Sequence, residues 1–100
     1  MSITLDDIKA ARTRIADHVR RTPLGPSPWL SDATGGQILL KAESLQTTSS
    51  FKLRGALNAI GGLLERTQGP APRVVTVSAG NHGRAMAWAA EQLGVALTVF

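Results

Sequence analysis

Residues 74–100 read VVTVSAGNHGRAMAWAAEQLGVALTVF, and this segment indicates the fold class more clearly than any other. Its β-branched opening, residues 74–77, is typical of a buried strand, and residues 95–100 repeat that character. The polar turn SAGNHG, residues 78–83, separates the first strand from an alanine-rich helical pattern that Gly94 ends. One face of that helix carries four apolar residues: Met86, Ala89, Ala90 and Leu93. A strand, a tight loop, a helix and a second strand form a βαβ unit, so we expect an α/β fold whose parallel sheet is packed against helices.

The chain before this unit alternates helical and extended patterns. Thr4 and Asp7 have the spacing of a capping box, and the apolar residues that follow predict a helix over residues 5–19. The segment RTPLGPSPWL, residues 21–30, holds three prolines within six residues, so we expect an extended or turning connector there. A short strand is predicted over residues 38–42.

A second helix is predicted to begin within the stretch TTSSFKLRGA, residues 47–56. Ser50 has the side chain of a helix N-cap, and the apolar residues after it recur at helical spacing. The predicted buried stripe of this helix has four members: Leu53, Leu57, Ile60 and Leu64. The segment TQGPAPR, residues 67–73, ends the helix.

Composition narrows the class of protein. The 100 residues are 43% hydrophobic and 18% charged, which suits one modest folded domain. The absence of cysteine excludes disulfides, thiolate metal sites and a cysteine nucleophile, and it fits a reducing compartment. No other residues have metal-ligand spacing. The N-terminus lacks the positive charge of a signal peptide and no apolar run is as long as a membrane span, so we expect a soluble cytoplasmic protein without a membrane partner.

The net charge of +4 raises nucleic acid as a possible partner. The eleven Lys and Arg residues are scattered singly, apart from Arg20 and Arg21, and only 4% of the residues are aromatic. We therefore expect a solvated basic surface and no nucleic-acid partner.

Lys52 is the first candidate for chemistry. It falls in the first turn of the second predicted helix, where free N–H groups and the positive end of the helix dipole disfavour another positive charge. Arg54 acts in the same direction if it lies close. A neutral amine is what imine formation with an aldehyde requires, so Lys52 is a candidate Schiff-base lysine; the alternative is a solvated surface lysine.

The loop SAGNHG is the second candidate. It joins the C-terminal end of a strand to the N-terminal end of a helix, where free N–H groups suit a carboxylate or a phosphate. Ser78 and Asn81 add neutral hydrogen-bonding groups, and His82 can donate or accept. The alternative is an ordinary helix cap in which Asn81 is the capping residue.

Together, SSFKLRGALNAI (residues 49–60) and VVTVSAGNHGRAMAWAA (residues 74–90) resemble the fold-type II pyridoxal-phosphate enzymes, in particular the threonine and serine dehydratase branch that includes serine racemase. The segments TPL (residues 22–24) and KAESLQ (residues 41–46) lie where that family carries similar residues. The resemblance implies a tryptophan synthase β-like architecture of two domains. Residues 1–72 would form the first part of the larger, cofactor domain, and residues 73–100 would open the smaller domain that binds the substrate carboxylate.

The resemblance also implies roles for individual residues. Lys52 would hold pyridoxal 5'-phosphate as a Schiff base and later move the α-proton, Phe51 would pack beside the pyridine ring, and Asn81 would hydrogen-bond the ring hydroxyl. The substrate carboxylate would be received by five residues: Ser50, Ser78, Gly80, Asn81 and His82.

The implied reaction is the dehydration and deamination of L-threonine or L-serine to a 2-oxo acid and ammonia. Ala79 stands where serine racemase carries its second acid/base, and alanine cannot exchange a proton, so elimination is favoured over racemisation. Ammonia release from 3-hydroxyaspartate, racemisation, β-replacement and a non-catalytic module remain as alternatives. The family's phosphate loop and pyridine-nitrogen partner lie beyond Phe100, so we expect an N-terminal fragment that is inactive alone and a homodimer at full length.

Overall fold

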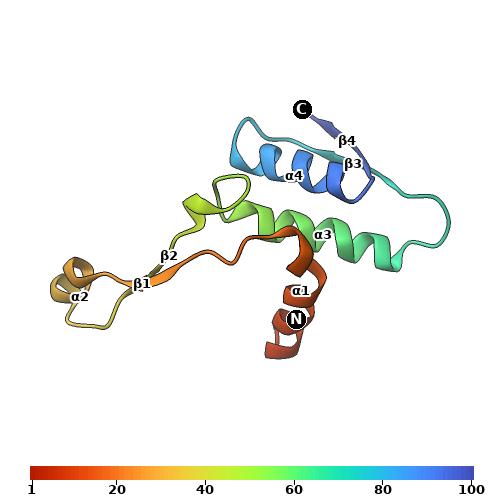
Figure 1. The fold of residues 1–100 in the computed structure, drawn as a ribbon. Helices are drawn as coiled ribbons and strands as arrows, with labels where there is room; N and C mark the ends of the chain where they lie inside the picture. Colours follow the sequence, from red (N-terminus) through yellow and green to blue (C-terminus); the bar gives the residue numbers. More distant parts are fainter.

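The computed structural model describes all 100 residues, and its shape is elongated, with extents of 53 × 31 × 26 Å. In chain order the elements are α1 (Leu5–Ile15), the 3-10 turn η1 (Ala16–His18), β1 (Leu24–Pro26), α2 (Pro28–Thr34), β2 (Leu39–Lys41), the 3-10 turn η2 (Glu43–Leu45), α3 (Lys52–Arg66), β3 (Arg73–Thr76), α4 (Asn81–Gln92) and β4 (Ala96–Val99). Helices α3 and α4 lie side by side in the centre, with β3 and β4 behind α4, and β1, β2 and α2 project as an arm (Figure 1).

The core lies mainly between α3 and α4, with Ile15 of α1 and Val95 added to it. From α3 it takes the apolar stripe of the sequence, and Leu53, Leu57 and Ile60 are the largest side chains that are fully buried. From α4 it takes Met86 and three alanines, Ala85, Ala89 and Ala90. The small alanine side chains let the two helices approach closely. Burial of each large aliphatic side chain contributes about 1.5–3 kcal/mol, so this helix pair is the main source of stability. Leu64, the fourth residue of the predicted stripe, packs against the core but is only partly buried.

The predicted βαβ unit is confirmed. Strand β3 pairs with β4 in parallel, with Val74 opposite Leu97 and Thr76 opposite Val99. Helix α4 connects them, packs on β4, and ends where Gly94 adopts a positive φ of 66°. The first strand begins at Arg73, one residue before the predicted start, and its alternating burial places Val75 outward with 68% of its surface exposed.

Helix α1 begins with the predicted capping box. Thr4 Oγ1 accepts the N–H of Asp7, and Asp7 Oδ2 accepts the N–H of Thr4 at 2.8 Å. The N–H and the hydroxyl of Thr4 both donate to Asp7 Oδ2, and these two hydrogen bonds lower the pKa of the Asp7 carboxyl below its ordinary value. The α-helix ends at Ile15, earlier than predicted, because the chain tightens into the 3-10 turn η1 before it becomes extended at Val19.

The proline-rich connector is only partly the extended segment that was expected. Residues 24–26 are extended and pair antiparallel with β2, but residues 28–34 form the helix α2. Pro28 stands at the first helical position, where its missing N–H removes no helical hydrogen bond. Ser27 Oγ caps this helix by accepting the N–H of Leu30 at 3.4 Å, and Gly35 ends it with φ at 71°.

Candidate functional site

Lys52 occupies the first position of α3, as predicted, and its side chain is exposed. Its Nζ lies 5.1 Å from the centre of the Phe51 ring, a distance at which an ammonium group and an aromatic face attract each other. Phe51 itself is 64% exposed, so the lysine and the ring present one mixed surface beside the start of the helix.

Ser50 does not cap α3, so that prediction was wrong. The residue at the cap position is Phe51, whose helical φ and ψ start the turn early, and no side chain satisfies the first N–H groups. Ser50 instead turns its hydroxyl inward, where Ser50 Oγ is buried and has no hydrogen-bond partner. Thr48 Oγ1, two residues earlier, is also buried without a partner. Such orphaned hydroxyls are rare in folded proteins and leave acceptors and donors for a ligand.

A pocket of about 270 Å³ lies between the first turns of α3 and α4. Phe51, Lys52 and Gly55 line it from one helix, and His82 and Met86 line it from the other. Two candidate regions that are far apart in the sequence therefore meet at one pocket. Asn81 does not line this pocket, although it is the neighbour of His82 and opens α4.

The SAGNHG loop is held by Ser78 rather than by Asn81. Ser78 Oγ accepts the N–H of Gly83 at 2.9 Å and that of Gly80 at 3.2 Å. The N-cap residue of α4 is Gly80, which has no side chain to accept a hydrogen bond. Asn81 is the first residue of the helix and does not cap it. The loop is tight: a Cβ at Gly83 would lie 3.0 Å from the Ser78 carbonyl oxygen.

Three backbone N–H groups of this loop, those of Ala79, Asn81 and His82, donate to no protein atom. They lie at the positive end of the α4 dipole, an environment that favours a carboxylate or phosphate. His82 Nε2 lies 3.1 Å from Thr76 Oγ1, which ties the imidazole to the end of β3. The predicted anion loop therefore has the donors its role requires, while its serine serves to hold the loop.

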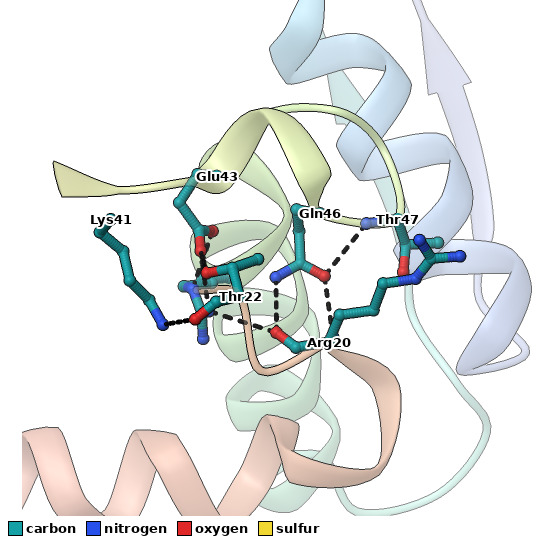
Figure 2. Close-up of polar contacts among 7 residues, drawn as sticks. Arg20, Thr22, Lys41, Glu43, Gln46 and Thr47 are labelled. Carbon is teal, nitrogen blue, oxygen red and sulfur yellow. Dashed lines mark hydrogen bonds and ion pairs between the residues drawn. The ribbon is translucent and has the colours of Figure 1, made fainter. Parts of the chain in front are cut away.

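Next to residues 47–51, here called the lysine loop, lies a polar cluster that the sequence interpretation missed (Figure 2). Its members are Arg20, Thr22, Lys41, Glu43, Gln46 and Arg54. Arg54 donates to both carboxylate oxygens of Glu43, each at 2.9 Å, so the Glu43 carboxylate offsets its charge. Hydrogen bonding to Arg54, helped by Thr22, lowers the pKa of Glu43 from 4.5 to about 2. The signal in the sequence was the pair Glu43 and Gln46 within KAESLQ, which was weighed only as a family likeness.

The structure contains no group of three or more His, Cys, Asp or Glu side chains arranged to hold a metal ion. None of its helices combines the length and the apolar character that crossing a bilayer would take.

Comparison with known proteins places these features in a family. Residues 15–100 match the family described as pyridoxal-phosphate dependent enzyme. The chain is 48% identical to the L-threonine ammonia-lyase of Thermotoga maritima over 99 residues, which cover 97% of this chain and 24% of that protein. It is 41% identical to the beta-hydroxyaspartate dehydratase of Paracoccus denitrificans, covering 96% of this chain and 30% of that one.

The likeness extends to solved structures. A pyridoxal 5'-phosphate-dependent aspartate racemase superposes with a TM-score of 0.84 at 47% identity, covering 99% of this chain and 31% of that one. The chain thus spans between about a quarter and a third of the length of these relatives. The matched family and the shared architecture mean that the chain belongs to the fold-type II pyridoxal-phosphate-dependent enzymes, whose cofactor is pyridoxal 5'-phosphate.

Proposed function

We propose that the protein is an ammonia-lyase that dehydrates and deaminates a small β-hydroxy amino acid, L-threonine or L-serine, to a 2-oxo acid and ammonia. The observation that carries this proposal is the meeting of Lys52 and His82, a residue of the SAGNHG loop, at one pocket. The free N–H groups of that loop lie next to this pocket, and an amine beside an anion site suits a substrate that has a reactive Cα next to a carboxylate.

The residues present fit the cofactor. The pocket next to Lys52 has one aromatic wall, Phe51, and an unpartnered buried hydroxyl, Ser50 Oγ, in the adjoining loop. Lys52 Nζ would form the covalent attachment, Phe51 would pack against the ring, and Asn81 would hydrogen-bond the ring hydroxyl. When bound, pyridoxal phosphate supplies a conjugated electron sink for charge that develops at the substrate Cα.

The chain's own residues orient the substrate and move the proton. The N–H groups of Asn81 and His82, with the hydroxyl of Ser50, would bind the carboxylate and so fix the direction of the Cα–H bond. The neutral amine of Lys52 would then remove the proton from Cα, after which the hydroxyl group leaves from Cβ. Ser78 would act through the loop, because its hydroxyl already accepts two backbone N–H groups, and Gly80 leaves the space before α4 open.

Ala79 favours elimination over racemisation. Racemisation needs a second proton carrier on the face of Cα opposite Lys52, and a methyl group cannot exchange a proton. Racemisation of a small amino acid is the second candidate, because the aspartate racemase is 47% identical to this chain.

The test is an assay of the intact protein, supplied with pyridoxal phosphate, on L-threonine, L-serine and 3-hydroxyaspartate. We expect 2-oxo acid from at least one of them, no inversion of L-aspartate or L-serine, and no product from Lys52→Ala. Inversion without 2-oxo acid would replace the lyase by a racemase, and activity that survives in Lys52→Ala would contradict the role of the lysine.

We further propose that residues 1–72 belong to the cofactor domain and residues 73–100 to the domain that binds the carboxylate, with the cofactor between them. The family resemblance supports this division. It assigns α3 and α4, which line the pocket together and share one core, to different domains. We also propose a homodimer, for which light scattering on the intact protein is the direct test.

A further inference from the structure

Gln46 joins two segments of the chain through both ends of its side-chain amide (Figure 2). Gln46 Oε1 accepts the N–H of Arg20 at 2.9 Å, and Nε2 donates to the Arg20 carbonyl at 3.0 Å. The same Oε1 accepts the N–H of Thr47, the first residue of the lysine loop, at 3.1 Å. Gln46 is only 3% exposed, so these three hydrogen bonds have little competition from water.

Glu43 makes the second connection, one turn earlier. It accepts two hydrogen bonds from Arg54 in the first turn of α3 and one from the hydroxyl of Thr22. Lys41 Nζ donates to the Thr22 carbonyl at 2.8 Å (Figure 2). Arg20 and Thr22 belong to the segment between η1 and β1, residues 19–23. One polar cluster therefore holds this segment together with η2 and α3.

The lysine loop, residues 47–51, has few bonds of its own. Ser49 N–H donates to the Gln46 carbonyl at 2.8 Å, but the hydroxyls of Thr48 and Ser50 are unpartnered. Ser49 also holds an unfavourable left-handed conformation, with φ at 61°. Such a loop keeps its shape only if its two ends are fixed, and the bonds of Gln46 and of Glu43 with Arg54 fix them.

We propose that Gln46 is a positioning residue for Lys52: its amide, supported by the Glu43–Arg54 pair, holds the loop so that Lys52 Nζ meets the cofactor. This inference rests on the proposed role of Lys52. Loss of the amide leaves the partly buried N–H groups of Arg20 and Thr47 without their acceptor, so the loop moves to find other partners. A displacement of about 1 Å at a reacting atom lowers a rate by up to about a hundredfold.

The experiment measures how fast Lys52 reacts with pyridoxal phosphate. The intact protein, freed of cofactor, is mixed with pyridoxal phosphate and quenched at intervals with borohydride. Nζ bonds to the aldehyde carbon with loss of water, hydride reduces the C=N bond, and peptide mass spectrometry measures the label. In Gln46→Leu we expect labelling at Lys52 to slow by at least about tenfold, together with faster hydrogen exchange at the Thr47 amide.

The matched control is Glu65→Gln. Glu65 pairs with Arg14 through two hydrogen bonds, as Glu43 does with Arg54, but it lies at the opposite end of α3 from Lys52. If an ion pair contributes only to stability, its removal lowers the melting temperature and leaves the labelling rate of the folded protein unchanged. Glu65→Gln should therefore label Lys52 at the wild-type rate, while Glu43→Gln should slow it.

Wild-type labelling kinetics in folded Gln46→Leu would overturn the inference and leave the proposed function intact. Absence of label at Lys52 in the wild type would overturn the proposed function, and this inference with it. If Gln46→Leu does not fold, Gln46→Asn provides the test, because it keeps a neutral amide but is one methylene too short to reach the same partners. It should label Lys52 more slowly than wild type, and a wild-type rate there would also overturn the inference.

Discussion

At the scale of single residues, Ser49 is the only non-glycine residue with a positive φ, at 61°. Its Cβ is crowded in that conformation, whereas glycine adopts it freely. We expect Ser49→Gly to raise the free energy of unfolding by about 0.5–1 kcal/mol, since the relief of strain exceeds the entropy that glycine adds to the unfolded chain. Urea unfolding of the intact protein measures the change.

Ser44→Gly is the control for Ser49. Ser44 is also an exposed serine but lies in η2 with negative φ, so glycine there should lower stability. Destabilisation by both substitutions to a similar degree would show that the left-handed conformation carries no strain.

Gly83 is required because the backbone of Ser78 passes close to its Cα. Alanine there would place a methyl group 3.0 Å from the Ser78 carbonyl oxygen, which belongs to the backbone and cannot turn away. We expect Gly83→Ala to lower the free energy of unfolding by about 1–3 kcal/mol. Gly55→Ala, near the start of α3 with nothing within 4 Å of the added Cβ, should be neutral or stabilising. Equal urea midpoints for the two variants would contradict this account.

The sequence placed Lys52 correctly in the first turn of α3, but Ser50 was wrongly predicted to cap that helix, and Asn81, the alternative cap of α4, does not cap it. Ser50 and Asn81 have the right side chains for capping, yet the cap is decided by backbone angles at Phe51 and by the reach of Ser78 over two residues. N-cap propensity says which side chains are able to cap a helix. Which residue takes the cap position depends on the backbone geometry of the loop, and this geometry is set by packing.

At the scale of elements, η2 is joined to α3 by an ion pair that depends on pH. The Arg54 hydrogen bonds hold the pKa of Glu43 at about 2, below its ordinary 4.5. The folded protein therefore binds fewer protons than the unfolded chain between these values. The stabilisation is complete above pH 4.5 and is lost as the pH falls through about 2.

Glu43→Gln removes this dependence. We expect it to lower the free energy of unfolding by about 1–3 kcal/mol at neutral pH, because Arg54 keeps a weaker partner. Urea unfolding across the acid range should show the difference from wild type shrinking below pH 4.5. Glu65→Gln should change stability less, since the Glu65 side chain is 57% exposed against 14% for Glu43. A difference that stays constant down to pH 2 would show that Glu43 acts through packing alone.

The strands and the central helices follow from the sequence pattern, and the short helix α2 does not. The apolar stripe of α3 reports burial directly, and the β-branched runs placed β3 and β4 within about one residue. The prediction that these strands are buried was wrong, because the sheet has two strands and Val75 is 68% exposed. In α2 the prolines masked a helix whose start signals were present: Ser27 as cap, Pro28 in the first turn and Gly35 at the end. Proline marks a helix start as readily as a helix end, and only the residues around it distinguish the two.

At the scale of the molecule, α3 and α4 share one core and open one pocket. The sequence predicted each helix with its buried face but not that these faces meet, because pairing of distant segments is set by packing and not by local pattern. The pocket between Lys52 and His82 is a consequence of that pairing. The family likeness suggested the roles proposed for Lys52 and His82, and the structure adds the polar cluster around Glu43, Gln46 and Arg54.

The most direct test of the account is to locate the cofactor on the chain. Borohydride reduction of the intact protein with bound pyridoxal phosphate, followed by peptide mass spectrometry, should place one covalent label on Lys52 and none on Lys9 or Lys41. The label should be absent from Lys52→Ala. A label on a different lysine, or one that persists in Lys52→Ala, would contradict the assignment of Lys52 and with it the proposed chemistry of the site.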